Sequence, residues 1–178
     1  AEEVLRPKAA DYDKMEKFPE EQIRALAANG FLAMLAPEAY GGTELGSQCY
    51  SLALTEVARG CASTSGTMAV TNMVCDAICA FGNDEQKKRY VPKLASAEII
   101  AGSFALSEPG SGSDAASLKA TAVKKGDRYL LNGSKCWTTS GDRSGVLLVM
   151  AKTDTSKGSR GISAFLVEPG WKGFSVGK

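Results

Sequence analysis

The sequence predicts an α+β protein in which an N-terminal helical bundle domain is followed by an antiparallel β-barrel or sandwich domain, incomplete at its end. In residues 1–98, apolar side chains recur at three- and four-residue steps, which is typical of helices. From residue 99 onward, short apolar or alternating runs bounded by glycine-rich turns predict strands. Because helices and strands form separate blocks, we expect two domains, residues 1–98 and 99–178, and no parallel sheet.

The helical segments are bounded by recognisable start and stop signals. They are predicted over residues 1–16, 19–29, 47–59, 63–81 and 87–94. The fourth segment is apolar on nearly all sides, which predicts the central helix of the bundle. Before the fifth segment, Asn83 and Gln86 have the spacing of a capping box. Pro92 should kink or end that last helix, because proline lacks the backbone N–H that the helix needs.

Strands are predicted over residues 99–106, 119–123, 128–131, 134–138, 145–151, 161–167 and 173–176. Asn132-Gly133 separates the third strand from the fourth, and this dipeptide is a strong signal for a two-residue hairpin turn. The first strand leads into the loop that ends at Asp114, where Pro109 and Gly112 cannot continue a central ladder. The backbone N–H groups and serine hydroxyls of this loop suit a ligand rich in oxygen acceptors.

The totals exclude several classes of function. A formal net charge of +1 gives no basic excess, so we expect no nucleic-acid partner. No apolar run reaches the roughly 18 residues of a membrane span, and no signal peptide is visible at the N-terminus. The 5 cysteines are odd in number and lie mostly in apolar, helix-like surroundings. They predict reduced thiols and a reducing compartment, either the cytoplasm or the mitochondrial matrix.

The chain contains no histidine, which excludes Ser-His-Asp and Cys-His nucleophiles. Cys75 and Cys79 would share one helix face, but they lack further ligands, so we expect no metal site. The run from Gly110 to Ala115 matches the letters G-x-G-x-x-A of a dinucleotide fingerprint. That fingerprint requires a helix at the glycines, whereas strands are predicted next, so a nicotinamide site is not expected.

Two stretches of the sequence together resemble the acyl-CoA dehydrogenase family. The run from Ser107 to Asp114 is similar to that family's Thr/Ser-Glu-Pro-Gly-x-Gly-Ser-Asp loop, and Trp137-Thr138-Thr139 is similar to its Trp-x-Thr motif. Three further stretches also fit the family: residues 37–42, 81–87 and 161–168. The resemblance covers nearly the whole chain and implies the N-terminal and middle domains of such an enzyme, without its C-terminal domain.

The resemblance implies FAD as the cofactor, lying against the β-domain. The implied FAD-binding residues are Phe104, Leu106, Ser107, Gly112, Ser113, Trp137, Thr138 and Thr139. Ser113 would also lie near the CoA part of the substrate. Trp137 would pack on the flavin ring, and Thr139 would donate its hydroxyl toward N5, where negative charge develops. Thr138 stands where isoleucine is frequent in the family, which is a small departure from its pattern.

The chemistry implied by the resemblance is α,β-dehydrogenation of an acyl-CoA thioester. A carboxylate takes the α-proton while the β-hydrogen leaves as hydride to FAD, and electrons pass to an electron-transfer flavoprotein. In the family the base is a glutamate of the C-terminal domain, so we expect no catalytic residue in this chain and a base beyond Lys178. The resemblance also implies a homotetramer or homodimer for the full-length protein, of which this chain would be a fragment.

Two alternatives remain open from the sequence. A flavin oxidase or monooxygenase of the same fold would react with O2, although the intact Glu-Pro-Gly-x-Gly-Ser loop argues against it. Peroxide released in air would favour that alternative. The chain could instead be a non-catalytic subunit or a binding fragment that a partner chain completes. Dehydrogenase activity that arises only on mixing with a partner would distinguish this case.

Overall fold

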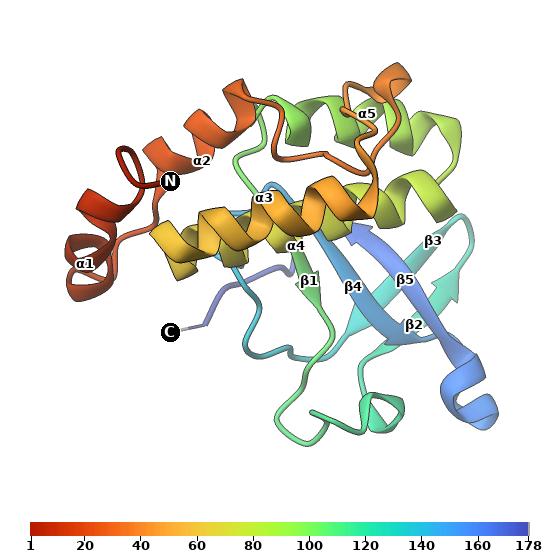
Figure 1. Cartoon of the computed structure of the whole chain (residues 1–178). Helices are drawn as coiled ribbons and strands as arrows, with labels where there is room; N and C mark the ends of the chain where they lie inside the picture. Colours follow the sequence, from red (N-terminus) through yellow and green to blue (C-terminus); the bar gives the residue numbers. More distant parts are fainter. Residues whose placement is uncertain (178) are drawn as a thin grey trace.

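The computed structural model describes residues 1–177 and has the α+β architecture that the sequence predicts (Figure 1). The helical part comprises α1 (Arg6–Lys14), α2 (Glu20–Ala28), α3 (Gly46–Gly60), α4 (Ala62–Phe81) and α5 (Asp84–Ala95), with a short 3-10 helix, η1 (Glu38–Tyr40). In Figure 1 these helices gather on one side of the molecule and the strands on the other. Within residues 1–177, no helix combines the length and apolar character needed to cross a membrane.

Helix α4 is the centre of the helical part, as its apolar sequence predicts. It contacts α1, α2, α3 and α5, and it also contacts the first strand of the sheet. Val74, Cys75 and Ile78 of α4 are buried in a cluster with Leu94 of α5 and Val146 of the sheet. The helical and β parts therefore share a hydrophobic core along this helix.

The start of α5 confirms the predicted capping box. The Asn83 side chain accepts a hydrogen bond from the Gln86 N–H at 2.8 Å, and the Gln86 side chain accepts one from the Asn83 N–H at 3.0 Å. Pro92 does not end the helix, which continues to Ala95. Pro92 lies in the last turn, where the buried side chain of Leu94 holds the chain in place despite the missing N–H.

The strands form one open, mixed sheet, which corrects the expected antiparallel barrel or sandwich. They are β1 (Gly102–Ala105), β2 (Thr121–Lys125), β3 (Arg128–Asn132), β4 (Val146–Lys152) and β5 (Ile162–Val167). The order is β1-β4-β2-β3, and β5 pairs antiparallel with β4. Strand β1 pairs in parallel with β4, with Gly102 opposite Val146. This is possible because the long connection between β1 and β4 lets the chain return to the same end of the sheet.

The predicted hairpin turn at Asn132-Gly133 is wrong. Strands β2 and β3 form the hairpin, with Lys125 opposite Arg128, so the turn lies one strand earlier. Gly133 follows β3, and a Cβ there would lie 2.6 Å from the Cβ of Ala120, so close packing explains this glycine. Among the described residues, 134–138 and 173–176 form no strand, which corrects those two predictions as well.

A polar contact joins the helical part to the end of the sheet. The Tyr90 hydroxyl of α5 donates a hydrogen bond of 2.7 Å to Oε1 of Glu168, just after β5, and Arg89 pairs with the same oxygen. Burial raises the pKa of Tyr90 to about 12, and the hydrogen bond to the Glu168 carboxylate contributes in the same direction. The folded protein therefore holds the Tyr90 proton more tightly than the unfolded chain does.

Tyr90→Phe should lower the free energy of unfolding at pH 7 by about 1–2 kcal/mol, because the Glu168 carboxylate loses a buried donor. The stability that the raised pKa provides is complete below pH 10, the ordinary pKa of tyrosine, and is lost as pH rises toward 12. Urea unfolding between pH 9 and pH 11.5 should thus show a weaker pH dependence in the variant. Tyr129→Phe, on an exposed strand residue, is the control. Equal pH dependence in wild type and Tyr90→Phe would contradict this assignment.

Candidate functional site

The structure brings the two stretches singled out in the sequence side by side. One is the loop that follows β1, and the other is the segment that leads into β4 (Figure 1). The Cys136 N–H donates to the Ser107 carbonyl at 2.9 Å. The Ser103 hydroxyl donates to the Thr139 carbonyl at 2.6 Å. The first contact joins the two stretches directly, and the second joins the Trp137 segment to β1, so this segment runs alongside β1 before it enters β4.

A buried ion pair reinforces this junction. Nζ of Lys135 lies 2.8 Å from Oε1 of Glu108 and 3.0 Å from the Leu106 carbonyl oxygen. The Glu108 carboxylate also accepts the backbone N–H groups of Lys119 at 2.6 Å and of Ala120 at 3.0 Å. Burial would raise the pKa of Glu108, but Lys135 and the two N–H donors outweigh it and hold that pKa below its usual value.

Trp137 is the most unusual residue of the site. Its side chain is 93% exposed, so it does not serve the core of the described residues. Its φ of 56° lies in the left-handed region, where a bulky aromatic residue is strained. Ser140, three residues later, is also left-handed, with φ of 57°. A large exposed ring held in a strained backbone is typical of a surface shaped for a ligand rather than for the fold.

The glycine-rich loop presents its tip to solvent. Glu108 and Ser111 form an antiparallel bridge with hydrogen bonds of 2.9 and 3.0 Å, and the Ser111 hydroxyl donates to the Asp114 carbonyl. Gly112 and Ser113 are exposed between these anchors. A Cβ on Gly112 would have no atom of the chain within 4 Å, so packing within this chain does not require glycine there.

The remaining predicted site residues lie close to the same junction. Phe104 is half-buried in β1, opposite Leu148 of β4. Leu106 is half-buried and packs against the buried cluster around Leu118, and its carbonyl accepts the Lys135 ammonium. Thr138 is half-buried, whereas the neighbouring Thr139 is exposed.

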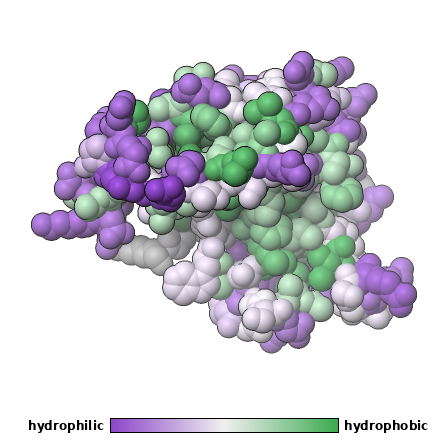
Figure 2. All heavy atoms as spheres, viewed as in Figure 1, coloured by the Kyte–Doolittle hydropathy of each residue, from purple (hydrophilic) through white to green (hydrophobic). Residues whose placement is uncertain are grey.

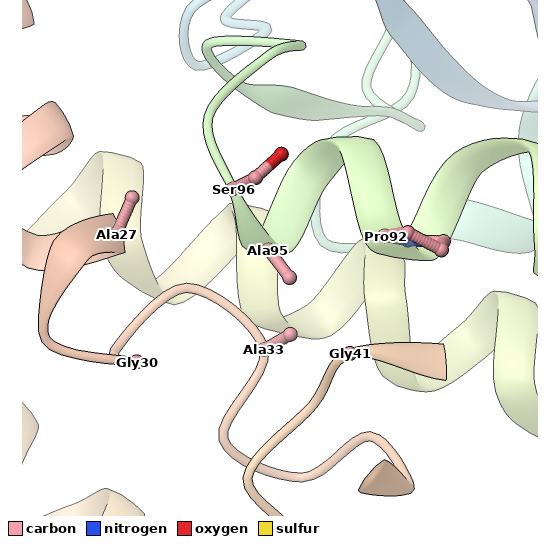
Figure 3. Close-up of a pocket in the computed structure, with 7 residues that line it drawn as sticks. All are labelled: Ala27, Gly30, Ala33, Gly41, Pro92, Ala95 and Ser96. Atoms are coloured by element: carbon pink, nitrogen blue, oxygen red, sulfur yellow. The ribbon is translucent and has the colours of Figure 1, made fainter. Parts of the chain in front are cut away.

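The described part of the chain contains hollows both at the predicted site and away from it. One of about 470 Å³ reaches the site, because Thr139 and Ser140 line it together with residues of α1 and α4. The other, of about 280 Å³, lies between α2 and α5 and contains no predicted site residue (Figure 3). The residues that line it have small side chains, none of which is titratable: Ala27, Gly30, Ala33, Gly41, Pro92, Ala95 and Ser96. Of these two hollows, only the first is lined by Thr139.

Comparison with known proteins identifies the family. The sequence-family model of the acyl-CoA dehydrogenase N-terminal domain matches residues 1–98. The family model of the acyl-CoA dehydrogenase middle domain matches residues 103–178. The chain belongs to the acyl-CoA dehydrogenase family. The resemblance carried by the Ser107–Asp114 loop and by the Trp137 motif is thereby confirmed.

Individual relatives agree with this family. This chain is 46% identical over 177 residues to the probable acyl-CoA dehydrogenase fadE25 of Mycobacterium leprae, covering 99% of this chain and 45% of that protein. It matches a chain in the structure of the electron transferring flavoprotein of Acidaminococcus fermentans with a TM-score of 0.93 and 37% identity, covering 99% of this chain and 46% of that one.

A third relative is a glutaryl-CoA dehydrogenase from Mycobacterium smegmatis, solved in complex with FADH2. Its TM-score is 0.90 at 30% identity, covering 97% of this chain and 43% of that chain. The chain of this acyl-CoA dehydrogenase family member therefore spans less than half the length of the relatives it matches.

Proposed function

We propose that residues 1–178 are the N-terminal domain (1–98) and part of the middle domain (99–178) of an FAD-dependent acyl-CoA dehydrogenase. One observation carries the proposal: the glycine-rich loop and the Trp137 segment are joined into one surface, on which Trp137 is exposed and strained. Membership of the family and the FADH2 complex of a relative support FAD as the cofactor.

The residues present fit the parts of FAD. Gly112 leaves room for close approach to its backbone, and the Ser113 hydroxyl beside it can donate to a pyrophosphate oxygen or to the CoA part of the substrate. Trp137 offers a free ring face for stacking on the flavin. Ser107 and the backbone of Leu106 can bond the pyrimidine edge. Phe104 and Thr138, both half-buried, complete the proposed FAD-binding residues.

The chemistry that bound FAD would supply is acceptance of a hydride from the β-carbon of the acyl chain. The protein's contribution is to orient the groups around that transfer. Thr139 would donate its hydroxyl to the flavin atom where negative charge develops. Ser103 donates to the Thr139 carbonyl and so fixes the backbone that carries this side chain. We propose that the base for the α-proton comes from outside residues 1–178 and that an electron-transfer flavoprotein is the acceptor.

The proposal is tested on the protein that contains this chain, expressed and purified without added flavin. It should be yellow, and the flavin should bleach when an acyl-CoA is added without oxygen. Turnover should depend on an electron-transfer flavoprotein or an artificial acceptor. A colourless protein, or one whose flavin ignores every acyl-CoA, would refute the proposal, and rapid peroxide release in air would favour an oxidase.

Thr139→Val should slow flavin reduction at saturating acyl-CoA by about 10- to 100-fold, because a donor to the developing charge is lost. The exposed side chain packs against little, so thermal stability should be unchanged. The measurement is stopped-flow absorbance of the flavin after mixing with substrate. Thr55→Val, on the exposed face of α3, is the matched control. An unaltered reduction rate in Thr139→Val would remove Thr139 from the proposed machinery.

We further propose that the full-length protein is a homotetramer or homodimer. Figure 2 shows a hydrophobic area that extends across one face of the molecule. Several large apolar side chains of the helices and the β2–β3 hairpin are at least 40% exposed: Leu52, Phe81, Val123, Tyr129 and Leu130. Exposed apolar surface of this kind is typical of protein that is covered in an assembly. Light scattering of the purified full-length protein measures the oligomeric state directly.

A further inference from the structure

The Glu108–Lys135 ion pair differs from the other ion pairs of the described residues. The exposed side-chain fraction is 7% for Glu108 and 11% for Lys135, whereas every other ion pair within residues 1–177 has a partner that is more than 50% exposed. Exposed pairs contribute little, because water and salt screen them. A buried carboxylate and ammonium instead depend on each other, since removal of one leaves an uncompensated charge.

The pair also connects three separate segments of the chain. Glu108 accepts the N–H groups of Lys119 and Ala120, which lead into β2. Lys135 bonds Glu108 and the Leu106 carbonyl at once, so it fixes the loop on both sides of Ser107. With two backbone donors and one ammonium in place, the Glu108 carboxylate is occupied by the chain itself.

The pair lies between the two groups of residues assigned to the flavin. Ser107 directly precedes Glu108, and Trp137 follows Lys135 by two residues. We propose that Glu108 and Lys135 are positioning residues, whose ion pair sets the distance between the Ser107 loop and the Trp137–Thr139 segment without touching the flavin. This inference rests on the proposed function. It adds a reason for two residues that do not contact the flavin to affect the rate, because misplacement by about 1 Å can slow a reaction by about 100-fold.

The test uses the full-length holoprotein. Lys135→Met removes the ammonium but leaves the two backbone bonds to Glu108 in place. We expect FAD to bind about 10-fold more weakly, and flavin reduction at saturating FAD and acyl-CoA to be about 10-fold slower, with KM changed less than about twofold. Lys135→Arg, which keeps the charge, should restore most of the rate. The double variant with Glu108→Gln should be no worse than the worse single variant, because both remove the same contact.

The matched control is Lys93→Gln, which breaks the exposed pair of Lys93 and Glu98, also 2.8 Å long, at the end of α5. It should leave FAD affinity and reduction rate unchanged. If Lys135→Met does not fold, Glu108→Gln takes its place as the test, with the same expected losses of FAD affinity and of flavin reduction rate. Failure of both variants to fold would overturn the inference and indicate a purely structural role.

The possible failures are distinguishable. A wild-type protein that is yellow and reduced by acyl-CoA, together with wild-type flavin affinity and rate in Lys135→Met, would overturn the positioning role alone. Single-variant effects that simply add in the double variant would do the same, because they would show that the two residues do not act as a pair. A colourless wild-type protein would overturn the proposed function and this inference together.

Discussion

Trp137→Ala should weaken FAD binding to the full-length protein by about 10- to 100-fold, which corresponds to about 1.4–2.8 kcal/mol. The reason is the loss of a flat stacking surface that 93% exposure leaves free for a ligand. The free energy of unfolding of the apoprotein should stay within about 0.5 kcal/mol of wild type, because the ring makes few contacts with its own chain. Fluorescence titration of the apoprotein with FAD measures the affinity, and urea unfolding measures the stability.

Trp171→Ala is the matched control for Trp137→Ala. Trp171 is also substantially exposed, at 51%, and it lies beyond β5 rather than at the junction of the two loops. Its truncation should leave FAD affinity unchanged. Equal FAD affinity in wild type and Trp137→Ala would contradict the flavin assignment, whereas a large loss of stability would mean that Trp137 supports the fold.

Asn72→Leu should lower the free energy of unfolding by about 3–5 kcal/mol, a large change for a side chain of similar size. Asn72 lies in α4 and is 1% exposed. Its Oδ1 accepts the Met34 N–H at 2.7 Å, and its Nδ2 donates to the carbonyls of Phe31 at 2.8 Å and Met68 at 3.0 Å. Leucine would leave the Met34 N–H and the Phe31 carbonyl buried without these partners, at about 1–3 kcal/mol each.

Thermal unfolding of Asn72→Leu should show a midpoint about 10 °C or more below wild type. Asn29→Leu is the control, because Asn29 is exposed at the end of α2 and bonds only its own helix. A change below about 1 kcal/mol in Asn72→Leu would mean that the connector after α2 does not depend on α4 for its hydrogen bonds.

The helices were predictable because their signals are local. The capping box at Asn83 and Gln86 acts over three residues, and the apolar character of α4 is visible in its own sequence. Strand pairing depends on residues far apart, and the errors lie there. Asn132-Gly133 has the strongest turn signal of the chain, yet the hairpin forms around Gly126, whose φ of 62° supplies the turn. Gly133 is instead required by its close approach to Ala120.

The candidate site divides in the same way. The glycine-rich loop and the Trp137 motif could be found from the sequence because each is a continuous run of residues. The pairing of Glu108 with Lys135 was missed, because the two residues are 27 positions apart. Glu108 lies in the recognisable Glu-Pro-Gly run, but nothing in that run indicates Lys135 as its partner. The local sequence around a glutamate beside a proline-glycine turn is the same whether the carboxylate faces water or a buried ammonium. Only the fold reveals which of these holds.

The parallel pairing of β1 with β4 also has a consequence for the order of folding. Gly102 meets Val146 only after the loop, the β2–β3 hairpin and the Trp137 segment have closed into one large ring of chain. Closing such a long loop costs more conformational entropy than forming a local helix or a hairpin does. The helices and the hairpin can thus form early, while the surface proposed to hold the flavin is assembled late. A nascent chain would acquire its capacity to hold a cofactor only once β4 has been made.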